Sequence, residues 1–240
     1  MFHKKLHVPA KAMLFGEYAV LQNFPAVAIT FYHYSFQINV NIKKSFHMKE
    51  NKVFIKSSFS SYGTFFDQLL HPWLNLLVGY DVEIEILQSF PPSLGFGSSS
   101  AIIAGVSLAL YEFFYDHKNI VEEAEFWKYV RKSIVCVQGK GSGYDVGVQL
   151  ASIFNSNKNV DCWSFENNQP VPVLKKLNVP YNLLKHYGCF LKTNIYSDTK
   201  KMLSTQKNNF AQQHGELSLH FLKNYSLQNI EELMYKSLSI

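Results

Sequence analysis

Hydrophobic and polar residues alternate along several short stretches of the chain, and in longer stretches hydrophobic residues recur every three to four positions. A period of two is typical of a strand with one buried face, and the longer period is typical of a helix. The strands predicted in this way are Leu6–Val8, Ala26–Thr30, Ser35–Ile42, Val53–Ser57 and Tyr80–Leu87. The predicted helices are Tyr62–Leu77, Ser99–Tyr115 and Val121–Val137. The first part of the chain therefore indicates a mixed fold of the α+β class.

Two polar segments interrupt this pattern further along the chain. Asn155–Asn159 is rich in asparagine and Gln169–Pro180 is punctuated by proline, and both compositions favour loops. They predict a boundary between a first domain over residues 1–165 and a second unit over residues 175–240. The pattern beyond it predicts a strand at Cys189–Thr193 and helices around Thr199–Leu222 and Leu227–Leu238. This is too little for an independent core, so either the segment packs onto the first domain or a second domain is incomplete.

The composition is that of a globular chain with a modest positive charge. Of the 240 residues, 47% are hydrophobic and 15% are aromatic, which is enough for one substantial core. The net charge of +5 is spread over the chain, and the densest lysine cluster alternates with apolar residues, as on a solvated strand face (Lys43, Lys44, Lys49, Lys52, Lys56). No nucleic-acid-binding motif accompanies this charge, so we expect no nucleic-acid partner, and a small anionic substrate fits the charge equally well.

Cysteine usage and hydropathy bear on the cellular compartment. Cys136, Cys162 and Cys189 are odd in number and widely spaced, without a C-x-x-C pair. They are interpreted as reduced thiols of a cytoplasmic protein rather than as a disulfide or zinc framework. The N-terminus lacks the long apolar run of a signal peptide, and no uninterrupted apolar run of about 18 residues predicts a membrane span. We therefore expect a cytoplasmic protein without a membrane partner, and the oligomeric state stays open.

The most informative segment runs from Pro91 to Ala101 and reads P-P-S-L-G-F-G-S-S-S-A. It lies between a predicted strand and a predicted helix, so it is expected to form a loop of small residues. Such a loop points backbone N–H groups and a helix N-terminus at one spot, where phosphate binds. Its glycines let the backbone approach an anion, and its serines supply hydroxyl donors or a magnesium ligand. The alternative is an ordinary strand-to-helix turn with serine N-caps.

Two further segments carry candidate chemistry. In Pro9–Leu21, Lys11 stands among apolar residues, where a lysine costs free energy unless an anion partners it. The alternative is a strand-edge lysine that reaches water. In Gln138–Val146, three glycines within five positions predict a loop with a special backbone just before Asp145. Asp145 either faces an acceptor hydroxyl or phosphate, or caps the apolar stretch that follows it.

In this order and spacing, the three segments resemble the motifs of the GHMP kinases, the superfamily of galactokinase, homoserine kinase, mevalonate kinase and phosphomevalonate kinase. Pro9–Val20 is similar to the first motif, P-G-K-x-x-L-x-G-E-[HY]-x-V, except that Ala10 replaces its glycine. Pro91–Ser100 is similar to the second motif, P-x-x-x-G-L-G-S-S-A, with departures at Phe96 and Ser100. Ser142–Asp145 is similar to the S-G-x-D element.

The resemblance covers roughly residues 6–155 and implies the fold of the first domain. It implies a ribosomal-protein-like N-terminal domain that binds ATP, over residues 1–165, and a partial α/β C-terminal domain, over residues 175–240. Within the superfamily, Gly16–Leu21 and Val137–Asp145 resemble phosphomevalonate kinases more than mevalonate kinases. Phe190–Thr193 resembles the strand that opens the C-terminal domain.

The resemblance also implies roles for individual residues. ATP and Mg2+ would be the cofactors, with the phosphates bound by Leu94, Gly95, Phe96, Gly97, Ser98, Ser99 and Ser100. Ser99 would also reach the magnesium ion. Asp145 would accept or orient the proton of the acceptor, and Lys11 would keep Asp145 ionised and draw charge from the phosphates. The acceptor pocket would be formed by Glu17, Tyr18, Lys140, Ser142 and Gly143, although Lys140 could equally point at solvent.

Two departures from the family pattern keep other functions open. Mevalonate kinases carry a magnesium-binding glutamate at the position that corresponds to about Ile134. The third glycine-rich motif is absent, because after Gly147 only Gly188 and Gly215 remain and neither lies in a cluster. The expected function is phosphoryl transfer to phosphomevalonate, with mevalonate as the alternative acceptor. A non-catalytic nucleotide-binding protein and a basic nucleic-acid-binding domain are the alternatives from other classes.

Overall fold

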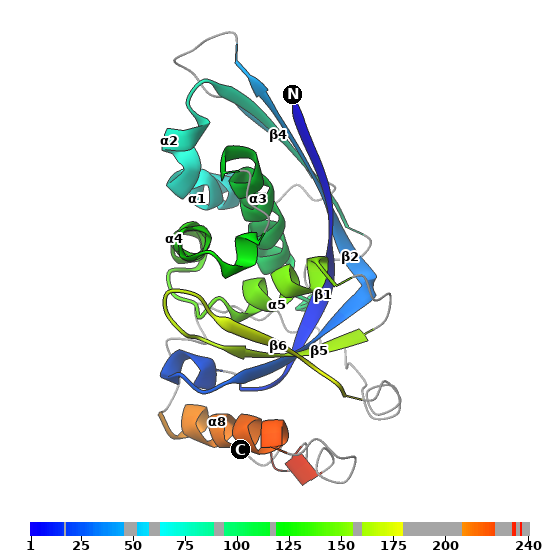
Figure 1. The fold of residues 1–240 in the computed structure, drawn as a ribbon, viewed down its shortest axis with the longest axis vertical. Coiled ribbons are helices and arrows are strands. Elements are labelled where there is room, and N and C mark those ends of the chain that lie inside the picture. The colour runs from blue at the N-terminus through cyan, green and yellow to red at the C-terminus, as the bar shows by residue number, and fades with distance from the viewer. Residues whose placement is uncertain are drawn as a thin grey trace.

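One sheet organises the protein, and the helices that precede β5 in the chain lie on one side of it (Figure 1). The computed structural model describes residues 1–16, 18–45, 52–57, 63–88, 94–115, 119–155, 160–179, 208–223, 232–233 and 236. Its strands are β1 (Phe2–Phe15), β2 (Ala26–Lys44), β3 (Lys52–Ser57), β4 (Tyr80–Gln88), β5 (Val160–Glu166) and β6 (Val173–Leu177). Its longer helices are α1 (Gly63–Leu70), α3 (Ser98–Tyr115), α4 (Ala124–Gln138), α5 (Tyr144–Ile153) and α8 (Asn208–Lys223). Its short helical turns are η1 (Ala19–Gln22), η2 (His71–Trp73), α2 (Leu74–Leu77) and η4 (Ile120–Glu122).

The long strand β2 holds the sheet together. The sheet has the order β3-β4-β2-β5-β6, and β1 pairs with β2 along its other edge. The first part of β2 pairs with β5 and the second part with β4, so one strand spans both halves of the sheet. All pairs are antiparallel except β3 with β4. The mixed sheet with helices confirms the predicted α+β class.

The predicted elements correspond closely to the observed ones in the first part of the chain. The strands predicted at Ala26–Thr30 and Ser35–Ile42 are one continuous strand, β2. The helix predicted over Tyr62–Leu77 is divided by the short turn η2, which has a proline in its first turn. Proline lacks the N–H that a helix interior requires, which explains the interruption. The region interpreted as a boundary contains two strands that were not predicted, β5 and β6.

Helix α3 forms the centre of the main hydrophobic core. It packs against β1, β2, α4 and α5, and most of its residues are buried. By length and composition it is the one helix among the described residues that could cross a membrane, but 72% of it is buried inside the protein. Its apolar character is therefore what its position in the core requires.

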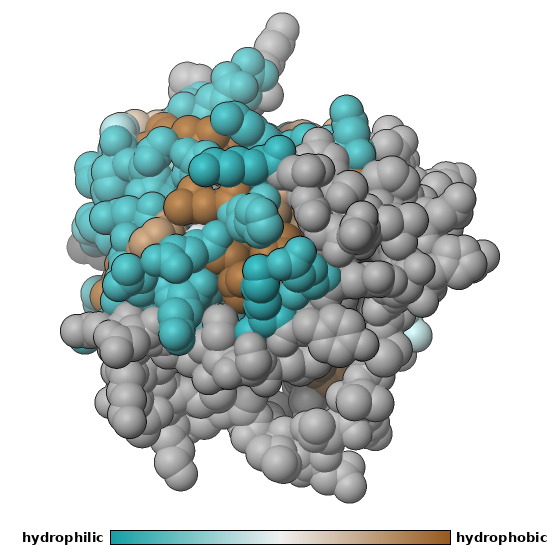
Figure 2. Space-filling model, turned by 90° about the horizontal axis from the view of Figure 1, so that it is seen from below, coloured by the Kyte–Doolittle hydropathy of each residue, from teal (hydrophilic) through white to brown (hydrophobic). Residues whose placement is uncertain are grey.

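The lower half of the sheet is covered on both faces. Ala26 and Ala28 of β2 share a hydrophobic cluster with Val148 of α5. Val27 and Ile29 point to the opposite face, where they contact a cluster that includes Leu217 and Phe221 of α8. Figure 2 shows the surface of the described residues from the α8 side, where a hydrophobic strip lies among hydrophilic residues.

Helix α8 begins within the unit predicted over residues 175–240. Its packing on the sheet corresponds to one of the two alternatives for this segment, that it packs onto the preceding part of the chain. The division into domains at residues 165 and 175 stays a prediction. The predicted strand at Cys189–Thr193, and most of the predicted helix at Leu227–Leu238, lie outside the described residues.

Candidate active site

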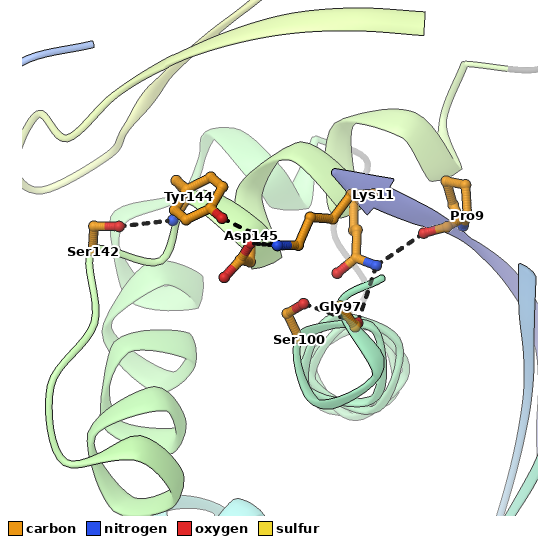
Figure 3. A network of polar contacts seen from close by, with 8 residues as sticks. Pro9, Lys11, Gly97, Ser100, Ser142, Tyr144 and Asp145 are labelled. Carbon is orange, nitrogen blue, oxygen red and sulfur yellow. Dashed lines mark hydrogen bonds and ion pairs between the residues drawn. The ribbon is translucent and has the colours of Figure 1, made fainter. Parts of the chain in front are cut away.

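Lys11 and Asp145 form an ion pair between β1 and the first turn of α5 (Figure 3). The Lys11 side chain is almost buried, with 10% of its surface exposed, and that of Asp145 is 29% exposed. The Lys11 ammonium also donates a hydrogen bond to the Tyr144 hydroxyl at 3.1 Å and lies 5.1 Å from the centre of the Tyr144 ring. A buried ammonium requires such partners, because leaving it unpaired in an apolar region is costly.

A register shift in β1 aims Lys11 at α5. Before the shift, between Pro9 and Ala10, the alternate residues Leu6 and Val8 face the main core. After it, Lys11 and Met13 face α5 instead, as the Lys11–Asp145 pair and the contact of Met13 with the cluster around Val148 show. Shifts of this kind change which side chains point to a given face of a sheet. The lysine of the first motif owes its orientation to this local irregularity.

Helix α5 begins at a glycine with a left-handed backbone. Gly143, with φ of 78°, is the N-cap of α5, and its carbonyl accepts the N–H of Gly147 at 2.8 Å. Asp145 lies in the first turn, where the helix dipole favours a negative charge. The N–H of Tyr144 donates to the hydroxyl of Ser142 at 3.3 Å. Together these contacts explain why the S-G-x-D element places its carboxylate at a helix N-terminus.

The loop before α3 lies directly against Lys11. Gly95 and Gly97 have positive φ angles of 74° and 78°, which favour glycine. A Cβ at Gly97 would lie 2.8 Å from the Cε of Lys11, whereas a Cβ at Gly95 would meet nothing within 4 Å. The N–H of Lys11 donates to the carbonyl of Phe96 at 3.1 Å, so strand and loop are also joined through the backbone. The second glycine of the loop is therefore required by the close approach of the lysine.

The serines at the start of α3 differ in their surroundings. The helix begins at Ser98, which is buried, and Ser99 is partly exposed in the first turn. Ser100 is buried, and its hydroxyl donates to the carbonyl of Gly97 at 3.0 Å. That carbonyl also accepts the N–H of Ala101 at 2.9 Å. The hydroxyl of Ser100 thus stabilises the turn into the helix, and that of Ser99 is the more accessible one.

The remaining predicted residues are spread around this centre. Leu94 is partly buried against the main core, and the Phe96 ring lies 5.9 Å and 6.0 Å from the ring centres of Phe31 and Tyr34. Tyr18 has a left-handed backbone, with φ of 62°, at the start of η1. Lys140 is exposed. Glu17 lies outside the described residues.

Two residues at this centre were not predicted as site residues. Tyr144 contacts the Lys11 ammonium through both its hydroxyl and its ring. The only sequence signal for this role was its position next to Asp145, after the glycine loop. Gln149 is fully buried, and its amide nitrogen donates to the carbonyls of Pro9 at 2.9 Å and Gly97 at 3.3 Å. Its sequence signal was a polar side chain four residues after Asp145 in an otherwise apolar stretch.

The oxygen groups near the loop suit a magnesium ion that is held largely by nucleotide phosphates. Mg2+ is typically bound by one or two carboxylates or hydroxyls together with phosphates and water. The hydroxyl of Ser99 would be its ligand from the protein. At the position that corresponds to the family's glutamate, Ile134 is buried, and its Cγ2 would lie 2.8 Å from a Cβ at Gly141. No group of three or more His, Cys, Asp or Glu residues that could hold a metal occurs among the described residues.

These residues define the chemistry that the site can perform. Three groups lie together here: the buried ammonium of Lys11, the carboxylate of Asp145 at the N-terminus of α5, and the glycine loop at the N-terminus of α3. Such an arrangement neutralises the charge of a phosphate group and places a carboxylate beside it, which is what phosphoryl transfer requires.

Comparison with known proteins agrees with this reading of the site. Residues 64–153 match the family model of the GHMP kinases N terminal domain. This match confirms the resemblance to the GHMP kinase superfamily that the three motifs predicted. The match includes the glycine loop and Asp145, and the first motif lies before it. No curated protein sequence matches the chain.

Solved structures of GHMP kinases share the fold. The mevalonate kinase of Methanococcus jannaschii is 18% identical with a TM-score of 0.61, over 98% of this chain and 77% of that one. Phosphomevalonate kinase of Streptococcus pneumoniae, in complex with phosphomevalonate and AMPPNP, is 14% identical with a TM-score of 0.63, over 99% of this chain and 78% of that one. Homoserine kinase from Cytophaga hutchinsonii is 13% identical with a TM-score of 0.58, over 98% of this chain and 71% of that one. The predicted GHMP kinase fold is thus confirmed.

Proposed function

We propose that this protein is a small-molecule kinase that transfers the γ-phosphoryl group of ATP to a small anionic precursor of isoprenoids. Phosphomevalonate is the preferred acceptor and mevalonate is the alternative. The observation that carries the proposal is the Lys11–Asp145 ion pair beside the glycine loop of α3. The solved relative with bound phosphomevalonate and AMPPNP supports both the nucleotide and the class of acceptor.

The proposed reaction follows from the positions of these groups. An oxygen of the acceptor attacks the γ-phosphorus, the bond to the bridging oxygen of the β-phosphate breaks, and ADP leaves. Backbone N–H groups of the loop and of the first turn of α3 hold the phosphates, and Lys11 offsets the negative charge on the transferred group. Magnesium, when bound with ATP, would neutralise further phosphate charge, with the hydroxyl of Ser99 as its ligand from the protein.

The role of Asp145 depends on the acceptor. The hydroxyl of mevalonate must lose a proton, and Asp145 would accept it. The phosphate of phosphomevalonate is largely ionised near neutral pH, by analogy with protein phosphates of pKa about 6. With that acceptor, Asp145 would mainly hold Lys11 in place, and the Lys11 ammonium would attract the attacking oxygen. An acceptor that carries both a carboxylate and a phosphate also agrees with the net charge of +5.

Steady-state kinetics on both acceptors test the proposal. ADP release should depend on magnesium and on an acceptor, with a higher kcat/KM for phosphomevalonate than for mevalonate. A clearly higher kcat/KM for mevalonate would overturn the choice of acceptor. AMPPNP binding without turnover of either acceptor would favour a non-catalytic nucleotide-binding protein, and the absence of AMPPNP binding would contradict the kinase proposal as a whole. We further propose a cytoplasmic location, which fractionation of the source cells would test.

A further inference from the structure

Gln149 joins the three segments that resemble the family motifs. It lies on α5 four residues after Asp145, so both side chains occupy neighbouring positions on one face of the helix. Its amide nitrogen donates to Pro9 in the first segment and to Gly97 in the second. Because both partners are carbonyl oxygens, which only accept, the nitrogen of the amide must be the atom that faces them.

These contacts are made in a part of the protein that excludes water. The exposed fraction of Gln149 is 0%, and its Oε1 has no hydrogen-bond partner among the described residues. Burying an amide with one group unsatisfied costs free energy, and an apolar side chain of the same length would avoid that cost. The placement of Gln149 is therefore better explained by what its two donated hydrogen bonds position than by core packing.

Hydrogen bonds to the carbonyls of Phe96 and Gly97 fix the orientation of the loop before α3. In a trans peptide the C=O and N–H groups point in opposite directions. The carbonyl of Phe96 is held by the N–H of Lys11, so the N–H of Gly97 points away from β1. The carbonyl of Gly97 is held by Gln149 in addition to Ser100 and Ala101, so the N–H of Ser98 points away from α5. Both N–H groups are in the loop to which the proposed function assigns phosphate binding.

We propose that Gln149 is a positioning residue that holds the Gly97–Ser98 peptide in the orientation that binds the phosphates of the nucleotide. That the loop binds phosphates rests on the proposed function. That Gln149 anchors the loop rests on geometry alone. Gln149 links the loop to the helix that carries Asp145, so the phosphate-binding groups and the carboxylate keep a fixed relation. The carbonyl of Phe96 is held by β1 through the backbone, and that of Gly97 is held by Ser100 and Ala101 within α3 and is joined to α5 by Gln149.

The test compares Gln149→Met with Ser152→Ala. Met keeps the length and the burial of the side chain and removes both donated hydrogen bonds. Ser152 is a matched control, because it is equally buried on the same helix and its hydroxyl contacts Thr30 at 3.1 Å, away from the loop. Both variants lose a buried polar contact, so both are expected to lower the thermal midpoint.

Two measurements separate positioning from stability. In the nucleotide-free protein, amide hydrogen exchange in residues 96–101 should be about tenfold faster in Gln149→Met, the size expected for one lost hydrogen bond, and unchanged in Ser152→Ala. The affinity for AMPPNP should fall about tenfold in Gln149→Met only, with KM for ATP raised more than KM for the acceptor.

Wild-type exchange and wild-type AMPPNP affinity in Gln149→Met would overturn the inference, and so would equal changes in both variants. If the wild-type protein does not bind AMPPNP, the proposed function fails. In that case the exchange measurement alone still decides whether Gln149 anchors the loop.

Discussion

Lys11 and Asp145 meet as an ion pair although they belong to different ends of the domain, one on β1 and the other at the start of α5. A second lysine of the same strand, Lys4, pairs with Glu112 of α3 at 2.7 Å, but there both side chains are about 30% exposed. The two pairs therefore differ in burial and in surroundings. Exposed pairs contribute little, whereas the almost buried Lys11 depends on its partners.

With mevalonate as the acceptor, Asp145→Asn should lower turnover at least about 10²-fold, because the proposed proton acceptor and the charge that holds Lys11 are both removed. The fold should be retained, since the amide oxygen of the new side chain can still accept a hydrogen bond from Lys11. Steady-state kinetics and circular dichroism measure the two effects. Glu112→Gln is the control, as it removes the carboxylate of the partly exposed Lys4–Glu112 pair and should leave turnover unchanged. Full activity of Asp145→Asn would exclude Asp145 from the mechanism.

Gly97→Ala should reduce activity far more than Gly95→Ala. Both positions have positive φ angles, so alanine introduces similar backbone strain, of about 1 kcal/mol or somewhat more, at each. Only at Gly97 does the added Cβ collide with the side chain of Lys11. We expect the thermal midpoints of both variants to fall, and kcat to fall at least about tenfold more in Gly97→Ala, since a displaced catalytic group is costly in rate. Equal kinetics of the two variants would show that Lys11 adjusts without loss.

Sequence patterns predicted the elements that carry the site well, because their signals are local. Composition identified both the small-residue loop between β4 and α3 and the glycine loop before Asp145. The helix predicted over Ser99–Tyr115 differs from the observed α3 by one residue. The strands β5 and β6 were missed, since polar and proline-rich neighbours masked them. Their pairing with β2 comes from tertiary contacts that no local pattern contains.

The details of the site depended on geometry that the sequence does not display. Nothing in the residues around Pro9 signals the register shift that turns Lys11 toward α5. Gln149 was passed over because a single polar residue in an apolar stretch is ordinary. Its importance follows only from the two carbonyls that lie beside it in the folded chain.

Tyr144→Phe tests how much of the placement of Lys11 depends on the hydroxyl. The substitution removes the 3.1 Å hydrogen bond and keeps the ring, with its contacts to Lys11 and Phe165. One net hydrogen bond to a charged group corresponds to about 1.5–3 kcal/mol, so kcat should fall more than about tenfold but less than in Asp145→Asn. Tyr144→Ala should reduce kcat further and also lower the thermal midpoint. An unchanged kcat in Tyr144→Phe would show that Asp145 alone holds the ammonium.

His214 of α8 should make stability depend on pH. The residue is buried, and burial lowers the pKa of its imidazole below the ordinary value. The unfolded chain, whose histidines titrate near pH 6.5, then binds more protons than the folded protein just below that pH. Stability is therefore fully present above the unfolded value and is lost as the pH falls through it toward the lower pKa of the folded state.

The measurement is the thermal midpoint between about pH 7.5 and pH 5.5, a range that spans the unfolded value. We expect the midpoint of the wild-type protein to fall with decreasing pH, and the fall to be smaller in His214→Gln, whose side chain does not titrate. His33→Gln is the control, because His33 is exposed and its removal should leave the slope unchanged. Equal slopes in all three proteins would mean that α8 tolerates a charged His214. A reduced slope in His214→Gln would show that α8 is packed on the sheet in solution, where Gly215 leaves no room between the helix and Phe24.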